Sequence, residues 1–137
     1  AGLIRLGLAN RVTQVLKPDT MLPAVGQGAL GIETRANDDA IRAALAPFED
    51  MDTRLAVLAE RALLAALRGG CLAPIGAWGR IRQGRLFLSA VVLDRDGRRR
   101  IARETDGPPH EAEALGVRLA GNLLAEGVDQ LLDQARE

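Results

Sequence analysis

The chain has 137 residues, of which 47% are hydrophobic and 26% charged, a composition typical of a globular protein with a packed core. Its 18 basic and 18 acidic side chains balance at neutral pH, which argues against a broad nucleic-acid-binding surface. No apolar run approaches the roughly 20 residues that span a bilayer, and a single cysteine excludes an intrachain disulfide, so we expect a cytoplasmic protein.

The opening of the chain predicts a short amphipathic helix over residues 3–16, although Gly7 weakens the pattern. We expect this helix to end at Lys17, because Pro18 disfavours helix in the residue before it. The chain begins with Ala1 and runs directly into an apolar pattern, so we expect it to be part of a longer protein. The predicted apolar positions of the helix are Leu3, Leu6, Val12 and Leu16.

Glycines and small or branched apolar residues mark the segment from Met21 to Arg35. Gly26 and Gly28 lie on either side of Gln27, which predicts an extended stretch with a tight turn. A strand from Ala29 to Glu33 is expected to follow. The dinucleotide-binding fingerprint needs a third glycine at fixed spacing and a helix directly afterwards, so we discount nucleotide binding here.

Two helices are predicted next. The polar run over residues 37–39 offers an N-cap for a short helix from Ala40 to Leu45, which Pro47 ends. Asp50 or Asp52 caps a longer helix, because apolar residues recur behind it at helical spacing and form one buried stripe. The predicted stripe consists of Leu55, Leu58, Ala59, Ala62, Leu63 and Leu67.

The pattern then changes to the alternation of β-strands, with glycine-containing turns between the strands. The three predicted strands are 75–81, 85–93 and 98–105, the turns are Gln83-Gly84 and Asp96-Gly97, and the buried face of the middle strand carries Leu86, Leu88, Ala90 and Val92. A last helix is predicted from about His110 to Ala135, with Gly127 as a point of bending. Helix, three antiparallel strands and helix make a small α+β domain in which the helices cover one face of the sheet.

Cys71 is the most conspicuous candidate for chemistry. Gly69 and Gly70 end the long helix and remove side chains beside the sulfur, while Pro74 stiffens the loop that follows. A thiol on such a loop suits an attachment point or a nucleophile, although a lone cysteine is more often a small buried hydrophobic residue. The residues alone leave these alternatives open.

Other polar features give weaker signals. Gln27, between its two glycines, could present its amide to a ligand, or the segment could be only a turn between packed elements. Residues 98–100 are three arginines that follow a turn, which is typical of a solvated strand start. His110 is the only histidine and has no partner cluster in sequence, so neither a metal site nor a histidine-based triad is predicted.

Three motifs, in the same order, resemble porphobilinogen deaminase, also called hydroxymethylbilane synthase. They are the opening Ala1-Gly2-Leu3-Ile4-Arg5-Leu6-Gly7-Leu8, the stretch Leu22-Pro23-Ala24-Val25-Gly26-Gln27-Gly28-Ala29-Leu30-Gly31-Ile32-Glu33, and Ala59-Glu60-Arg61-Ala62 followed by Gly69-Gly70-Cys71 and Pro74-Ile75-Gly76. The resemblance runs along essentially the whole chain, yet the chain would be less than half of a typical family member.

The resemblance implies a transferase of tetrapyrrole biosynthesis. Such an enzyme condenses four porphobilinogen molecules head to tail with loss of ammonia, and water releases linear hydroxymethylbilane. The growing chain stays on a dipyrromethane cofactor bound by a thioether to the cysteine that matches Cys71, with Gly69 and Gly70 leaving room for the first pyrrole ring. Arg5 matches an arginine that binds pyrrole carboxylates, and Gln27 falls in a glycine-rich segment near the inter-domain cleft, where it is expected to contact the cofactor. Departures at Leu72 and Trp78 do not touch the thioether.

The resemblance also implies a division of the chain. Residues 1–20 would end a second domain, residues 21–49 would return to a first domain and include a hinge, and residues 50–137 would form the C-terminal, cofactor-carrying domain. The fold class is thus α+β, a three-stranded antiparallel sheet with helices on one face, preceded by fragments of two α/β domains. The complete enzyme would be a monomer without a metal.

The family's catalytic aspartate belongs to the first domain, so no catalytic residue is expected in this chain. We therefore expect the chain alone to be inactive and its partner to be the missing N-terminal half. Two alternatives stay open: a stand-alone α+β ligand-binding module and a structural domain that binds a partner through its sheet. Both would leave Cys71 a free thiol.

Overall fold

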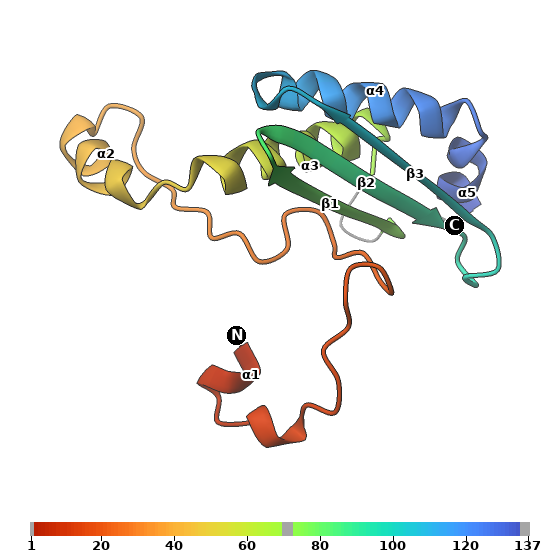
Figure 1. Ribbon diagram of the computed structural model, residues 1–137, viewed down its shortest axis with the longest axis horizontal. Helices are drawn as coiled ribbons and strands as arrows, with labels where there is room; N and C mark the ends of the chain where they lie inside the picture. Colours follow the sequence, from red (N-terminus) through yellow and green to blue (C-terminus); the bar gives the residue numbers. More distant parts are fainter. Residues whose placement is uncertain (1, 70–72, 135–137) are drawn as a thin grey trace.

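The structure, a computed structural model, describes residues 2–69 and 73–134. Its folded part is a three-stranded antiparallel sheet with helices packed on it, which we call the α/β body (Figure 1). This confirms the predicted α+β class. In chain order the body consists of α3 (Met51–Ala66), β1 (Ile75–Arg82), β2 (Arg85–Leu93), β3 (Arg100–Gly107), η3 (Pro109–Glu111), α4 (Ala112–Leu124) and α5 (Val128–Gln134).

The strands lie in the order β1-β2-β3, and each pairs with the next in an antiparallel register. Gln83 and Gly84 alone connect β1 to β2, and both have positive φ, 52° and 73°, as a type I′ hairpin turn requires. The prediction for this hairpin is confirmed. Asp96-Gly97 is part of a longer loop, because Asp94 accepts hydrogen bonds from the backbone N–H groups of Gly97 and Arg98 and β3 begins only at Arg100.

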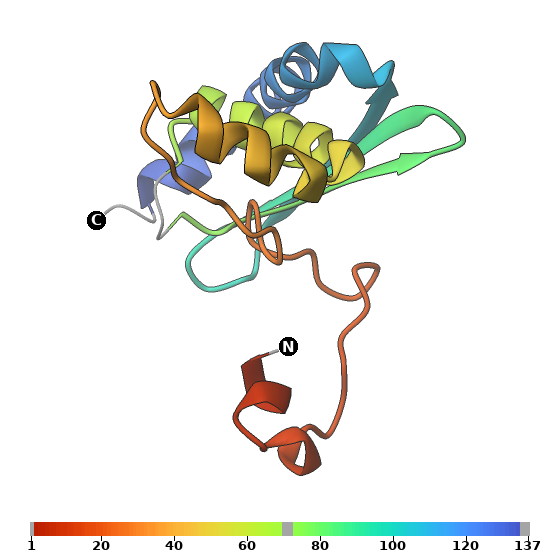
Figure 2. The same cartoon turned by 90° about the vertical axis from the view of Figure 1, so that its left-hand side faces the viewer.

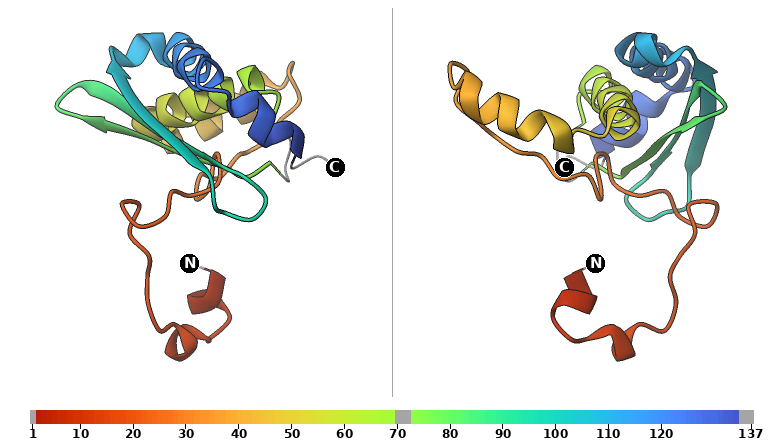
Figure 3. Two further views of the ribbon diagram at one scale, coloured as in Figure 1. Left: turned by 90° about the vertical axis from the view of Figure 1, so that its right-hand side faces the viewer. Right: turned by 60° about the vertical axis from the view of Figure 1, so that its left-hand side comes forward.

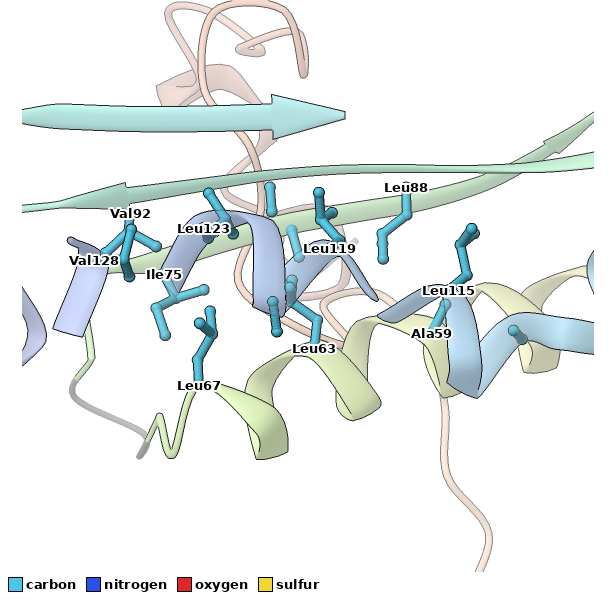
Figure 4. Packing of buried hydrophobic residues seen from close by; sticks show 14 of the residues in the cluster. Ala59, Leu63, Leu67, Ile75, Leu88, Val92, Leu115, Leu119, Leu123 and Val128 are labelled. Atoms are coloured by element: carbon cyan, nitrogen blue, oxygen red, sulfur yellow. The ribbon is translucent and has the colours of Figure 1, made fainter. Parts of the chain in front are cut away.

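Both long helices cover the same face of the sheet, so the core lies between one helical layer and one sheet layer (Figure 3). The alternating residues of β2 that were expected to be buried, Leu86, Leu88, Ala90 and Val92, are all buried against these helices. Leucines of α3 and α4 interdigitate below them (Figure 4). Buried and less buried residues alternate strictly along β2, which explains why its buried face could be predicted from the sequence.

The helices α3 and α4 touch closely where Gly116 of α4 lies on α3. A Cβ added to Gly116 would stand 2.2 Å from the carbonyl oxygen of Ala59 and 2.8 Å from the backbone nitrogen of Leu63. Any side chain at this position would therefore force the two helices apart.

The last predicted helix, from His110 to Ala135, is wrong in detail. A short 3-10 turn, Pro109–Glu111, comes first, and α4 and α5 are separate helices (Figure 2). Gly127, predicted to bend the helix, has φ 82° and lies directly before α5. The break turns Val128 and Leu131 into the core instead of letting them continue along the axis of α4.

The chain before the body is mostly irregular: its first part, with α1, extends away from the body, whereas residues 23–26 lie against β1 and α3 (Figures 1 and 2). It contains α1 (Gly2–Arg5), η1 (Ala9–Arg11), α2 (Asp39–Leu45) and η2 (Ala46–Phe48). The predicted helix over 3–16 is wrong, because Gly7 takes φ 71° and the expected apolar face is exposed rather than buried against other described residues. The short helix near residue 40 is confirmed, with Asp38 as its N-cap.

The predicted strand from Ala29 to Glu33 is also wrong for this structure. Among the described residues, no strand pairs with residues 29–33. The β-bridge formed by this part of the chain lies earlier, between Ala24 and Gly76. Leu30 is 96% exposed and Ile32 64% exposed. A strand without neighbours gains no ladder of hydrogen bonds and buries no side chains. Within residues 2–69 and 73–134, no helix combines the length and apolarity that crossing a membrane requires.

Candidate functional site

The loop between α3 and β1 begins at a well-formed helix end. Arg68 has φ 52° and donates its N–H to the carbonyl of Ala65, and Gly69 donates to the carbonyl of Leu64. This is the Schellman arrangement, with arginine in the left-handed position that glycine usually takes. The prediction that Gly69 and Gly70 form the C-cap is therefore wrong for Gly69. Arg68 takes the left-handed conformation, and Gly69 is the residue after it.

Gly69 is closely packed. A Cβ placed on it would lie 2.5 Å from Cδ1 of Leu64 and 2.7 Å from Cδ1 of Ile75. Both atoms are the ends of flexible side chains, so a larger residue at this position would require Leu64 and Ile75 to shift rather than the backbone. Gly70 and Cys71, the other predicted residues of this loop, lie outside the described residues, and the roles of all three in holding a cofactor stay predictions.

The far end of the loop is tied to the sheet. Ile75 donates its N–H to the carbonyl of Ala73 at 2.7 Å, and the carbonyl of Pro74 accepts from the N–H of Leu93 at 3.0 Å. The loop thus starts from a capped helix and ends at β1, where Pro74 is bonded to the middle strand β2. Hydrogen bonds to α3 and to β2 therefore hold the described residues on either side of 70–72.

The glycine-rich turn that contains Gln27 lies against the body. Gln27 donates to the carbonyl of Ala24 at 3.0 Å, and φ values of 71° at Gly26 and 89° at Gly28 allow the chain to reverse. Just before the turn, Ala77 of β1 donates to the carbonyl of Pro23 at 2.9 Å. The turn is therefore held beside β1, the strand that follows the Cys71 loop, and the side chain of Gln27 is exposed.

Sequence reasoning missed Glu60 as a functional candidate. Glu60 is only 6% exposed, and its two carboxylate oxygens accept different backbone N–H groups, from Gly26 and from Gly79, each at 2.7 Å. Burial raises the pKa of Glu60, and the two hydrogen bonds oppose that rise. The signal was present in the sequence: Glu60 falls in the buried stripe of α3, four residues after Ala56 and three before Leu63.

Arg5 lies apart from these residues. It is the last residue of α1 and is exposed, in the part of the chain that extends away from the body (Figure 1). A shallow hollow beside it is lined by Gly2, Ile4, Arg5 and Leu6. The structure therefore brings Gln27 beside the C-terminal body but does not bring Arg5 to it.

The open face of the sheet, which α3 and α4 leave uncovered, carries a second polar cluster. The guanidinium of Arg80 lies 4.4 Å from the ring centre of Trp78 and donates to Ser89 Oγ at 2.8 Å and Glu104 Oε2 at 2.7 Å. Hydrogen bonds from Ser89 and Arg80 lower the pKa of Glu104. These contacts join side chains from all three strands, although Nε of Arg80 is buried without a hydrogen-bond partner. Cross-strand contacts of this kind stabilise a sheet.

No metal site is formed by the described residues, among which no group of three or more histidine, cysteine, aspartate or glutamate side chains gathers. His110 lies in the 3-10 turn η3 and is exposed, 3.9 Å from Glu111. It has no place in the arrangement around the Cys71 loop.

Comparison with known proteins covers both parts of the chain. A family model described as porphobilinogen deaminase, C-terminal domain, matches residues 54–125, and another described as porphobilinogen deaminase, dipyromethane cofactor binding domain, matches residues 1–43. Gln27 and Arg5 fall within the second match, and the α3–β1 loop falls within the first.

Curated relatives named porphobilinogen deaminase agree with these models. The protein from Desulforudis audaxviator (strain MP104C) is 50% identical over 136 residues, which are 99% of this chain and 44% of the relative. The protein from Carboxydothermus hydrogenoformans (strain ATCC BAA-161 / DSM 6008 / Z-2901) is 43% identical over 136 residues, with the same coverage. The chain spans less than half the length of these relatives. Since the C-terminal family model alone matches more than half of the chain, the chain belongs to the porphobilinogen deaminase family.

Proposed function

We propose that the protein containing this chain is a transferase of tetrapyrrole biosynthesis. It joins four porphobilinogen molecules head to tail, releases one ammonia at each condensation, and frees hydroxymethylbilane by adding water. The growing product is held on a dipyrromethane cofactor bound by a thioether to Cys71. We further propose that the complete protein is a cytoplasmic monomer.

The observation that carries this proposal is the anchoring of the α3–β1 loop. Its first end is fixed by the helix cap at Gly69, and its second end by the hydrogen bond between Pro74 and Leu93. The turn with the exposed side chain of Gln27 is held beside the strand that leaves this loop. An attachment point needs such rigidity, because the pyrrole chain must return to one place through several condensations.

The donor chemistry of these residues fits the cofactor. Each pyrrole ring carries an acetate and a propionate, and the exposed amide of Gln27 and guanidinium of Arg5 are hydrogen-bond donors for carboxylates. Arginine also grips a carboxylate at two points. The thiolate of Cys71 would be a soft nucleophile for the electrophilic methylene carbon of an azafulvene-like pyrrole. As the carbon–sulfur bond forms, the electron pair of the methylene double bond would move through the ring to its nitrogen, which takes up a proton. When bound, the cofactor supplies the primer ring to which substrate pyrroles are joined.

We propose the same division of the chain as the sequence predicts: residues 1–20 end a second domain, 21–49 return to a first domain, and 50–137 carry the cofactor. Support comes from the exposed apolar residues of the return segment, Leu30 and Ile32, whose alternation suits a strand that pairs with a sheet in the missing half. In the complete protein, Arg5 would then reach the pyrrole carboxylates from the second domain.

Activity measurements test this proposal. The full-length protein should convert porphobilinogen to hydroxymethylbilane, and the Cys71→Ala variant should not, because no thioether can form. The 137-residue chain alone should make no product, because the catalytic aspartate lies in the missing half. Product formation by the isolated chain, or by Cys71→Ala at the wild-type rate, would contradict the proposal. An inactive full-length protein whose Cys71 reacts freely with a thiol reagent would instead favour a ligand-binding or interaction module.

A further inference from the structure

Glu60 joins three segments that are distant in sequence. It lies on α3, its Oε1 accepts the N–H of Gly79 on β1, and its Oε2 accepts the N–H of Gly26 in the turn before Gln27. The contacts span 19 and 34 residues along the chain. One side chain therefore connects the helix that precedes the Cys71 loop, the strand that follows it, and the turn that carries Gln27.

The core packing does not require a carboxylate at this position. The neighbours of Glu60 on the buried stripe of α3 are Ala56, Ala59 and Leu63, and an apolar side chain would continue the stripe without the cost of burying a charge. Buried ionisable groups with a shifted pKa occur preferentially at functional sites. The two backbone bonds are therefore the feature that explains an acid here.

Both partners of Glu60 are glycines for structural reasons. A Cβ on Gly79 would stand 2.8 Å from the carbonyl oxygen of Ala56 and 2.9 Å from its Cα, so only glycine lets β1 approach α3 closely enough for this bond. Gly26 has φ 71°, a conformation that side chains rarely adopt. The backbone on each side is shaped to present an N–H to the same carboxylate.

We propose that Glu60 is a positioning residue of the reaction, which fixes the turn carrying Gln27 to the helix and strand that hold the Cys71 loop. Through this link, the turn that carries Gln27 keeps a constant position relative to α3 and β1, the two elements between which the proposed attachment point lies in the sequence. The inference rests on the proposed function for its role in turnover, but the link itself can be measured independently of activity.

The first test is amide hydrogen exchange in the full-length holoenzyme. The amides of Gly26 and Gly79 should be protected in the wild type, and Glu60→Gln should speed the exchange of at least one of them about tenfold or more, because a side-chain amide has one acceptor oxygen where the carboxylate has two. The amide of Leu88 in the core should exchange at the wild-type rate. Glu113→Gln, the same change at an exposed position of α4, is the matched control and should alter none of these amides.

The second test asks whether Glu60 acts through Gln27. Glu60→Gln and Gln27→Ala should each lower kcat for porphobilinogen, and the double variant should lose no more than the more impaired single variant, since both changes remove the same placed amide. If the two fold-reductions in kcat multiply in the double variant, Glu60 does not act through Gln27. An unchanged kcat in Gln27→Ala beside a lowered kcat in Glu60→Gln would exclude the same mechanism.

The exchange measurement also separates the two proposals. Rapid exchange of the Gly26 amide in the wild type would overturn the link without any variant, even if Glu60→Gln does not fold. A protected Gly26 amide that Glu60→Gln exposes, in a full-length protein that does not act on porphobilinogen, would keep the link and remove the proposed function.

Discussion

Glu104 and Arg80 face each other on the open side of the sheet, and Ser89 lies between them on β2. The hydrogen bonds from Ser89 and Arg80 lower the pKa of Glu104 below its ordinary value, about 4.3 for a glutamate. Because its pKa is lower in the folded state, ionised Glu104 stabilises the fold at pH values above the ordinary glutamate pKa. This contribution is lost as the pH falls through the lowered pKa.

The pKa of Glu60 is shifted in the opposite direction, because burial raises it. Its contribution to the free energy of unfolding therefore falls as the pH rises from the ordinary glutamate pKa through the raised pKa.

We therefore predict that Glu104→Gln weakens the acid dependence of stability. In the wild-type chain the free energy of unfolding should fall as pH decreases below about 4.3, and the variant should lose less over that range because it has no carboxylate to protonate at this position. Urea unfolding at a series of pH values measures the slope. Equal slopes in the two proteins below pH 4.3 would show that Ser89 and Arg80 do not favour the ionised form.

A second prediction at this scale concerns two glycines of one helix. Gly116→Ala should lower the free energy of unfolding by about 3 kcal/mol, because its Cβ would meet the backbone of α3. Gly121→Ala, where nothing lies within 4 Å of the added Cβ, should raise it by about 0.5–1 kcal/mol through helix propensity. Urea unfolding of both variants decides the sign at each site; two stabilising changes would show that α3 and α4 do not touch at Gly116.

At the scale of the element, the hairpin between β1 and β2 offers a clean test. Gln83 has φ 52°, a left-handed conformation that asparagine adopts more readily than glutamine. We predict that Gln83→Asn raises the free energy of unfolding by about 0.5 kcal/mol. Gln130→Asn, the same change inside α5, should lower the free energy of unfolding by roughly a few tenths of a kcal/mol, because asparagine is the weaker helix former. A loss at both positions would contradict the type I′ turn.

The elements that the sequence predicted correctly are those whose signals are local. Strand β2 alternates residue by residue, Asp50 caps α3 by accepting the N–H of Thr53, and Gln83-Gly84 is a two-residue turn. The link through Glu60 joins residues 34 positions apart, and no local pattern specifies it. An acid inside the apolar stripe of α3 was the only local sign of that contact.

The incorrect predictions have a common physical cause. The helix over 3–16 and the strand over 29–33 were both inferred from apolar periodicity, which indicates a buried face but does not supply the element that buries it. Among the described residues, nothing covers Leu30 or Val15, which is 81% exposed. Such segments acquire regular structure only when a neighbouring sheet or helix is present.

At the scale of the whole molecule, the chain consists of one packed body and a leading segment suited to another part of the protein. Its core is contained within residues 56–132, where the buried leucines of α3, α4, α5 and β2 meet. Residues before α3 instead expose large apolar side chains, among them Ile4, Leu6, Leu30 and Phe48. This division agrees with a match to less than half of each curated relative. Under the function proposed above, the α/β body would carry the cofactor, and the catalytic aspartate would come from the half of the protein that this chain does not cover.

The proposed function depends on Cys71 as the residue that carries the covalent dipyrromethane cofactor. The intact mass of the full-length protein purified from its native source, followed by peptide mapping, tests it most directly. We expect one adduct of the size of two linked pyrroles on the peptide that contains Cys71, and no adduct in Cys71→Ala. An unmodified Cys71 peptide in a full-length protein that turns over porphobilinogen would rule out this attachment.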